Sequence, residues 1–281
     1  MTVKIVTDSL SDITSDVAEG LGITVVPLTV IFGHESFLDR VTITTDEFYH
    51  RLIHDSVWPT TTQPAPSIFA DIYDKLAEET EEILAVTLSS KMSGTYESAL
   101  NAKSLITKKC RIEVIDSLTV GMGLGLIVIA AAKRAQNGAK LDELSSWVRQ
   151  AMSRSHFVVC LDTLKYLAKG GRIGKAKELL GSLLSVKQLL SVKEGELAPL
   201  TRFRSQAASI DYLYNFATGF ANIEEMAVEH TTLPDEADKL TDRLGAIYPK
   251  DNIYRSTVSP VLGTHAGPGA LAITILEAER K

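Results

Sequence analysis

Several features that often direct the interpretation of a sequence are scarce here. Cysteine occurs twice in 281 residues, at Cys110 and Cys160, without the paired spacing of a zinc site or a disulfide framework. Acidic residues outnumber basic ones by 35 to 29, which gives a net charge of -6, and no lysine- and arginine-rich run is present. These absences argue against nucleic acid as a partner, and they favour a reducing, cytoplasmic location.

Long hydrophobic runs are also lacking. The most apolar stretch, "VGMGLGLIVIAAA" at 120–132, is shorter than the ~20 residues that span a bilayer, so we expect a buried helix and no stable membrane insertion. Its three glycines leave room for a ligand or for close helix packing, and the sequence leaves both open. The first ten residues lack the apolar core and cleavage site of a signal peptide, so export is not expected.

The order of strand-like and helix-like patterns predicts the fold class. Apolar strand patterns over 4–9, 23–32, 82–88 and 111–117 alternate with helical patterns, which favours a largely parallel sheet with helices on both faces. From about Ser155 the order changes to strand, helix and hairpin, which is typical of an α+β domain with a mainly antiparallel sheet. We therefore predict an α/β protein of two domains, 1–155 and 156–281, with a ligand between them.

The stretch "SSKMSGTYESA" at 89–99 lies between an apolar strand and a helix. The carboxyl ends of parallel strands are the usual ligand-binding edge of such a sheet. A helix amino terminus offers unpaired N–H groups there, so Ser93 with the amides of Gly94 and Thr95 is a candidate anion site. An ordinary N-cap serine is the simpler interpretation of the same residues.

Two further stretches strengthen the case for a site. "PTTTQPAP" at 59–66 holds three threonines between prolines in what we expect to be a loop. "GTHAGPGA" at 263–270 places His265 in an expected glycine-rich loop, where the backbone can approach a ligand closely. A rigid connector and a histidine without a catalytic role are the simpler interpretations of these two loops.

Other chemistries fit the spacing less well. "GGRIGK" at 170–175 is one residue short of a nucleotide-binding P-loop. His50 and His54 share a helical face with Glu47, but no further ligand supports a metal site, and we interpret them as a solvated face. Ser93 lacks the flanking glycines of a nucleophile elbow. A serine hydrolase therefore requires that His265 approaches Ser93.

Seven motifs in order resemble the DegV family over nearly the whole chain. They are "TDSLSD" at 7–12, "TTTQPAP" at 60–66, "SSKMSGTYESA" at 89–99, "VIDS" at 114–117, "LKYLAKGGRIG" at 164–174, "PLTRFRS" at 199–205 and "THAGPGA" at 264–270. The resemblance implies a bacterial lipid-binding protein of two α/β domains. Some members are the fatty-acid-binding subunit of fatty acid kinase, which presents the fatty acid's carboxyl group to a separate kinase that makes the acyl phosphate from ATP.

The resemblance also implies a set of site residues. The family's T-S-Q-P pattern falls on 61–64, with Thr62 in place of the usual serine, and its S-G-T-Y pattern falls on 93–96. The implied carboxylate-binding residues are Thr61, Ser93 and His265. Thr62, Gly94 and Thr95 are the implied supporting residues, and Arg172 and Arg202 resemble positions at the pocket mouth or on the kinase-facing surface.

The resemblance therefore implies a subunit that binds a long-chain fatty acid and presents it, with no catalytic residues, cofactor or metal of its own. The residue types agree, because a monoanionic carboxylate needs a few hydroxyl and N–H donors, whereas a phosphate site normally recruits several cations. Two alternatives stay open. One is a lipid hydrolase or acyltransferase that uses Ser93 with His265, and the other is a lipid carrier that works without a kinase.

Overall fold

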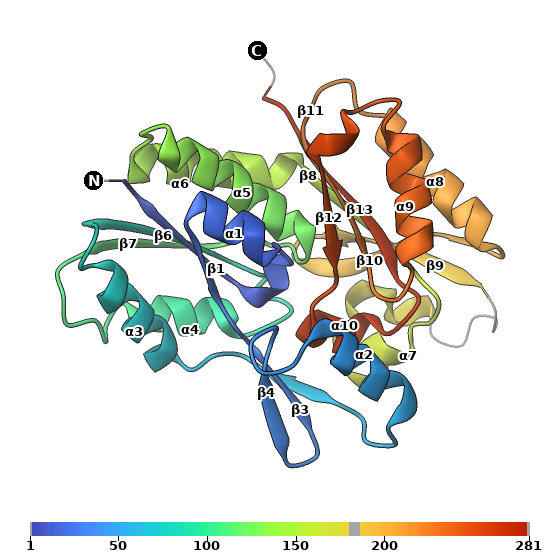
Figure 1. The fold of residues 1–281 in the computed structure, drawn as a ribbon, viewed down its shortest axis with the longest axis horizontal. Coiled ribbons are helices and arrows are strands. Elements are labelled where there is room, and N and C mark those ends of the chain that lie inside the picture. The colour runs from blue at the N-terminus through green and yellow to red at the C-terminus, as the bar shows by residue number, and fades with distance from the viewer. Residues whose placement is uncertain (1, 180–185, 280–281) are drawn as a thin grey trace.

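The computed structural model describes residues 2–179 and 186–279, and its two main sheets lie on either side of a central helix (Figure 1). The first is a parallel sheet in the order β2-β1-β6-β7. Its strands are β1 (Lys4–Asp8), β2 (Ile23–Val26), β6 (Glu82–Thr87) and β7 (Arg111–Asp116). Their central residues are mostly buried, as expected of a parallel sheet that is covered on both faces.

Helices cover both faces of this sheet, as the sequence predicts. On one face, α3 (Pro66–Leu76) and α4 (Thr95–Ala102) pack Phe69, Tyr73 and Ala99 against the strands. The opposite face is covered by α1 (Ser15–Leu21), α5 (Met122–Gln136) and α6 (Leu141–Ala151).

The second sheet has six strands in the order β10-β9-β8-β13-β11-β12. They are β8 (Ser155–Leu161), β9 (Lys187–Lys193), β10 (Glu196–Phe203), β11 (Ile223–His230), β12 (Ile253–Thr257) and β13 (Leu271–Glu277). The sheet is mainly antiparallel, as predicted, and β11 with β12 forms its parallel pair. One face packs against α8 (Gln206–Thr218) and α9 (Pro234–Leu244).

The helix α5 contacts both main sheets. Twelve of its 15 residues are buried, and it packs against β1 and β6 of the parallel sheet and against β8, β11 and β13 of the other. A Cβ at Gly125 would overlap the carbonyl oxygen of Ser11, and one at Gly123 would overlap the Thr119 hydroxyl. Close packing therefore explains these two glycines.

A small third sheet was not predicted. The sequence indicates one strand over 23–32, but the chain forms two strands, β2 and β3 (Thr29–Phe32), on either side of Pro27. Proline has no N–H to donate to a central ladder, so the chain leaves the parallel sheet there. The antiparallel sheet has the order β4-β3-β5, with β4 (Glu35–Leu38) and β5 (Thr60–Thr62).

The remaining helices connect these layers. They are α2 (Thr45–His54), α7 (Lys165–Lys169) and α10 (Pro260–Ala266), with 3-10 turns at Ser9–Ser11, Met152–Arg154, Gly174–Leu179 and Lys250–Asn252. Among the described residues, no helix is both long enough and apolar enough to cross a membrane. The strands of the parallel sheet end at Asp116 and those of the six-stranded sheet begin at Ser155. The domain boundary at residue 155 stays a prediction.

Candidate functional site

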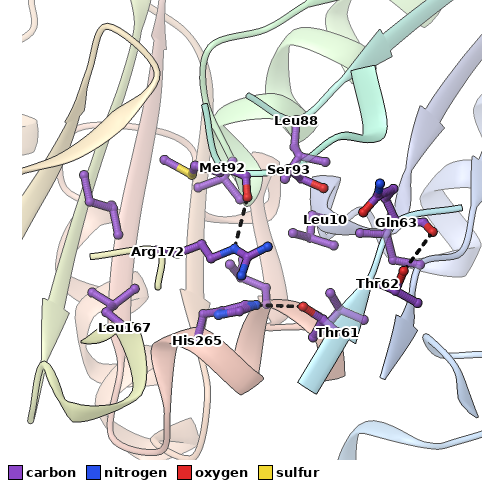
Figure 2. Close-up of a pocket in the computed structure, with 15 residues that line it drawn as sticks. Leu10, Thr61, Thr62, Gln63, Leu88, Met92, Ser93, Leu167, Arg172 and His265 are labelled. Atoms are coloured by element: carbon purple, nitrogen blue, oxygen red, sulfur yellow. Dashed lines mark hydrogen bonds between the residues drawn. The ribbon is translucent and has the colours of Figure 1, made fainter. Parts of the chain in front are cut away.

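Three segments that are far apart in the sequence line one cavity: β5, the turn after β6, and α10 (Figure 2). Thr61 and His265 lie together, with 2.9 Å between the Thr61 Oγ1 and His265 Nε2 atoms. Ser93 lines the same cavity, together with Thr62 and Gln63. We call this the head cavity. Gln63 is the polar lining residue that sequence reasoning did not select, although it lies in the same motif as Thr61.

Two of these residues lie in regular structure, so the prediction of loops at both places was wrong. Thr61 is the central residue of β5 and pairs with Val30 of β3, because the small sheet supplies the partner strand. His265 lies on α10, which begins at Pro260, where the fixed φ of proline suits the first helical position. The helix ends before Gly267, whose φ is 73°.

Ser93 is not the N-cap that the simpler interpretation predicts. The helix α4 begins at Thr95, and Gly94 is its N-cap. The Ser93 hydroxyl lies 2.9 Å from the Thr95 hydroxyl, which is fully buried. A Cβ at Gly94 would lie 2.9 Å from Nε2 of Gln63, so a residue without a side chain lets Gln63 approach this turn.

The environment of His265 keeps its imidazole neutral at pH 7. Burial, followed by the nearby charge of Arg172, lowers the pKa of His265 from 6.5 to about 4. Its Nδ1 atom has no hydrogen-bond partner among the described groups, and it faces Gly170, where a Cβ would overlap the ring. The neutral ring can donate or accept at Nε2, depending on its tautomer.

The two predicted arginines lie in different places. Arg172 lines the head cavity although it is exposed, and its guanidinium donates to the carbonyl oxygens of Met92 at 3.2 Å and Gly170 at 2.7 Å. Arg202 is exposed on β10 and is not among the residues that line the head cavity. The structure therefore brings Arg172 together with Thr61, Ser93 and His265, and leaves Arg202 apart.

An apolar cavity adjoins the head cavity, and the two share four lining residues, Val120, Leu167, Leu197 and Leu262. We call this the tail slot. Its other lining residues are Phe157, Val159, Leu161, Glu229, Val258, Ala266, Ala270 and Ala272. Sequence reasoning selected none of these residues, because apolar strand positions give the same pattern whether they face a ligand or a packed core.

The hydrogen bonds of Ser93 and His265 do not form a catalytic pair. The Ser93 hydroxyl pairs with Thr95, and His265 pairs with Thr61. A pKa of about 4 also makes His265 a weak general base at neutral pH. Within the described part of the chain, no group of three or more histidine, cysteine or acidic residues is placed to hold a metal ion.

Comparisons with known proteins identify the relatives of this chain. A DegV domain-containing protein of Caldanaerobacter subterraneus subsp. tengcongensis is 36% identical over 275 residues, which cover 96% of this chain and 97% of that protein. A DegV family protein from Thermus thermophilus, whose structure is described as showing fatty acid binding, superimposes with a TM-score of 0.90 at 28% identity over 99% of this chain and 100% of that one.

A second solved structure has the same fold. It is DegV from Bacillus subtilis, described as a fatty acid binding protein, with a TM-score of 0.90 at 28% identity over 99% of this chain and 100% of that one. The model of the DegV family, described as uncharacterised proteins, matches residues 2–278. The chain therefore belongs to the DegV family.

Proposed function

We propose that this protein binds a long-chain fatty acid, with the carboxylate in the head cavity and the hydrocarbon chain in the tail slot between the two domains. The observation that carries the proposal is that the two cavities adjoin and share four apolar lining residues. A cavity that holds a few polar side chains beside an almost wholly apolar one matches a ligand with one charged end. The fatty acid binding described for the Thermus and Bacillus relatives supports this assignment.

The chemistry of the head cavity suits a single negative charge. The hydroxyls of Thr61 and Ser93 are donors, and neutral His265 donates in one of its tautomers. Thr62, Gly94 and Thr95 support them from neighbouring positions. Arg172 is the one cation among the described lining residues, whereas a phosphate dianion normally recruits several.

The tail slot supplies most of the affinity in this proposal. Each methylene that leaves water contributes ~0.8 kcal/mol, so a tail of a dozen carbons gains more than the few hydrogen bonds of the carboxylate. The lining residues Val159, Leu161 and Ala272 are almost fully buried. At the other end, Thr62, Gln63 and Arg172 are exposed. This difference supports an orientation with the carboxylate near the surface and the tail inside.

The exposed head end suggests the protein's role. We infer that the chain presents the carboxylate to a separate fatty acid kinase in the cytoplasm, which makes the acyl phosphate, and that the chain performs no chemistry itself. Arg202, exposed on β10, is the proposed docking residue for that kinase. A carrier that works without a kinase is the alternative that uses the same site.

Copurified ligand tests the binding proposal. Native mass spectrometry of the purified protein, followed by denaturing extraction, should find one fatty acid per chain. Thr61→Val and Ser93→Ala should each reduce its occupancy, because each removes a donor to the carboxylate. Thr60→Val, on the same strand, and Ser90→Ala, in the same turn, do not alter the cavity lining and should retain full occupancy. A protein that carries no lipid, or carries a phosphorylated metabolite, would contradict the proposal.

The kinase role needs a separate measurement. ATP consumption by a fatty acid kinase catalytic subunit should require this protein loaded with fatty acid. Arg202→Ala should lower that activity while the fatty acid stays bound, and Arg204→Ala, an exposed neighbour, is the matched control. Equal activity of Arg202→Ala and the unchanged protein would rule out docking through Arg202.

An ester-hydrolysis assay tests the enzymatic alternative. The protein should not turn over activated esters of fatty acids, because Ser93 and His265 direct their hydrogen bonds elsewhere. Turnover that disappears in Ser93→Ala would replace the binding proposal by a serine-dependent hydrolase.

A further inference from the structure

The face of the six-stranded sheet that lines the tail slot changes from apolar to acidic at one strand. Leu190 of β9, Val159 of β8, Ala272 of β13 and Glu229 of β11 lie directly opposite one another in successive pairs. Residues paired in this way share a face of the sheet. The row is apolar over three strands and reaches a carboxyl group at the fourth, where Glu229 is only 1% exposed.

Glu229 is the one ionisable side chain among the described lining residues of the tail slot. Its Oε1 atom accepts a hydrogen bond of 2.9 Å from the backbone N–H of Met122, at the start of α5. A Cβ at position 121 would lie 2.9 Å from the same oxygen, so Gly121 lets the carboxyl group approach the helix. The other oxygen, Oε2, receives no hydrogen bond from any donor in the described part of the chain.

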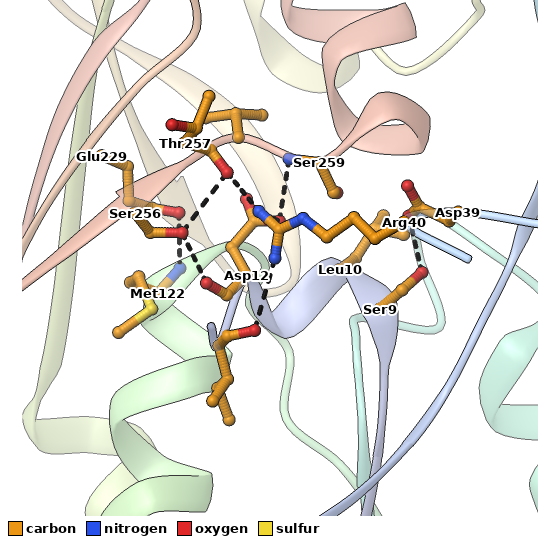
Figure 3. A network of polar contacts seen from close by, with 12 residues as sticks. Ser9, Leu10, Asp12, Asp39, Arg40, Met122, Glu229, Ser256, Thr257 and Ser259 are labelled. Carbon is orange, nitrogen blue, oxygen red and sulfur yellow. Dashed lines mark hydrogen bonds and ion pairs between the residues drawn. The ribbon is translucent and has the colours of Figure 1, made fainter. Parts of the chain in front are cut away.

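Asp12 lies beside Glu229 (Figure 3). Like Glu229, it has one carboxyl oxygen that receives no hydrogen bond from the described groups. Its Oδ1 atom accepts from the Ser259 N–H at 3.0 Å and pairs with Arg40 at 3.4 Å. Its Oδ2 atom, like Oε2 of Glu229, has no donor among the described groups. Burial, followed by the charge of Asp12, holds the pKa of Glu229 well above its ordinary value. One proton shared by the two carboxyl groups would satisfy both oxygens, and Arg40 would balance the charge that remains.

We propose that Glu229 is the residue that ends the tail slot, so that affinity rises with tail length only until the terminal methyl group reaches this carboxyl group. A methyl group placed against Glu229 gains no apolar contact. The carboxyl group is buried and held by its hydrogen bond to Met122, so it cannot move into water to make room for the methyl group. A hydroxyl group on the last carbon of a tail that reaches Glu229 finds a hydrogen-bond partner there. The inference rests on the proposed function and adds to it the class of tail that the slot accepts.

The unchanged protein provides the first test. Affinity is measured by calorimetry for saturated fatty acids of increasing length, and for the same acids with a hydroxyl on the last carbon. Each methylene should tighten binding roughly fourfold up to a break, beyond which length adds nothing. The terminal hydroxyl should weaken shorter tails by roughly tenfold or more and cost little at the length of the break.

Two variants then assign the break to this residue. Glu229→Met places an apolar side chain of similar length in the slot, so the terminal hydroxyl should weaken binding at every length, including the length of the break. Glu229→Gln is the matched control. It keeps an acceptor for Met122 and a donor for Asp12, so it should retain the break of the unchanged protein.

The outcomes separate this inference from the proposed function. If fatty acids bind but affinity rises without a break, or the hydroxyl costs the same at every length, Glu229 does not end the slot, although the binding proposal stands. If no fatty acid binds, both fail. The length and hydroxyl series of the unchanged protein decide the question if Glu229→Met does not fold. A terminal hydroxyl that costs as little at the break in Glu229→Met as in the unchanged protein also overturns the inference.

Discussion

His265 in the head cavity and the cluster of buried acids Asp8, Asp12, Asp39 and Glu229 both place ionisable groups inside the protein, but burial shifts their pKa values in opposite directions. In the head cavity, His265 is neutral because burial and Arg172 lower its pKa to about 4. In the acid cluster, Asp8, Asp39 and Glu229 have raised pKa values, chiefly because burial penalises their charged forms. The histidine avoids a buried charge by losing its proton, whereas these acids avoid one by keeping theirs.

This difference gives the two regions opposite effects on stability as pH changes. The pKa of Asp8 and of Asp39 rises from 3.8 to about 7 on folding, so their contribution is present at low pH and is lost as pH rises toward 7. The pKa of His265 falls from 6.5 to about 4, so its contribution is present above 6.5 and is lost as pH falls. The two effects therefore oppose each other between about pH 4 and 7.

Removing the counter-charge of the acids should have the largest effect on stability. Arg40→Met takes the guanidinium from Asp12 and should lower the free energy of unfolding by about 3 kcal/mol at pH 7, because it leaves a buried charge uncompensated. The loss should shrink at pH 5, where the acids bind protons more readily. Urea unfolding at both pH values measures this.

Arg111→Met is the control for Arg40→Met. Arg111 pairs with Asp142, and both side chains are largely exposed, so its removal should cost less than about 1 kcal/mol. An equal loss for Arg40→Met at pH 7 and pH 5 would show that the guanidinium does not act through the charge of the acids.

Removing the histidine should alter the acid side of the stability curve. In His265→Asn, the fall in unfolding free energy between pH 6.5 and pH 4 should be smaller than in the unchanged protein by about 3 kcal/mol, the linkage value of the lowered pKa. Thermal unfolding at several pH values measures the difference. His54→Asn, at an exposed position of α2, is the control. Identical curves for His265→Asn and the unchanged protein would exclude a neutral buried imidazole.

The smallest expected effect comes from one hydroxyl beside the acids. Ser9 donates to Oδ2 of Asp39 at 2.7 Å and accepts from the N–H of Leu28 at 3.1 Å. Ser9→Ala should cost about 1.5 kcal/mol and should cost more at pH 8 than at pH 5, because charged Asp39 depends more on its donor. Urea unfolding provides the test, with exposed Ser104→Ala as the control. A loss of unfolding free energy that is the same at pH 5 and pH 8 would show that Ser9 does not stabilise the charged form of Asp39.

The sequence predicts the head end of this site better than the tail end. Thr61, Ser93 and His265 lie in short polar or glycine-rich motifs, and the structure places all three on one cavity. Their local structure was harder to predict. The three residues of β5 have no periodicity of their own and become a strand only because β3 pairs with them, and α10 begins before the glycines that suggested a loop.

The residues that line the tail slot are brought together by the register of paired strands, and a single sequence does not reveal which residues pair. Val159 and Ala272 come from strands more than one hundred residues apart, and each has the pattern of an ordinary buried position. Glu229 stands at the end of an apolar strand, where an acidic side chain is usually exposed. Only the pairing of β11 with β13 brings it beside Ala272.

The shared helix α5 determines how the protein should come apart. Because its buried side chains complete the interior of both main sheets, neither sheet retains a finished hydrophobic interior when the other is lost. Denaturation should consequently proceed as a single cooperative transition, in which the head cavity and the tail slot disappear together.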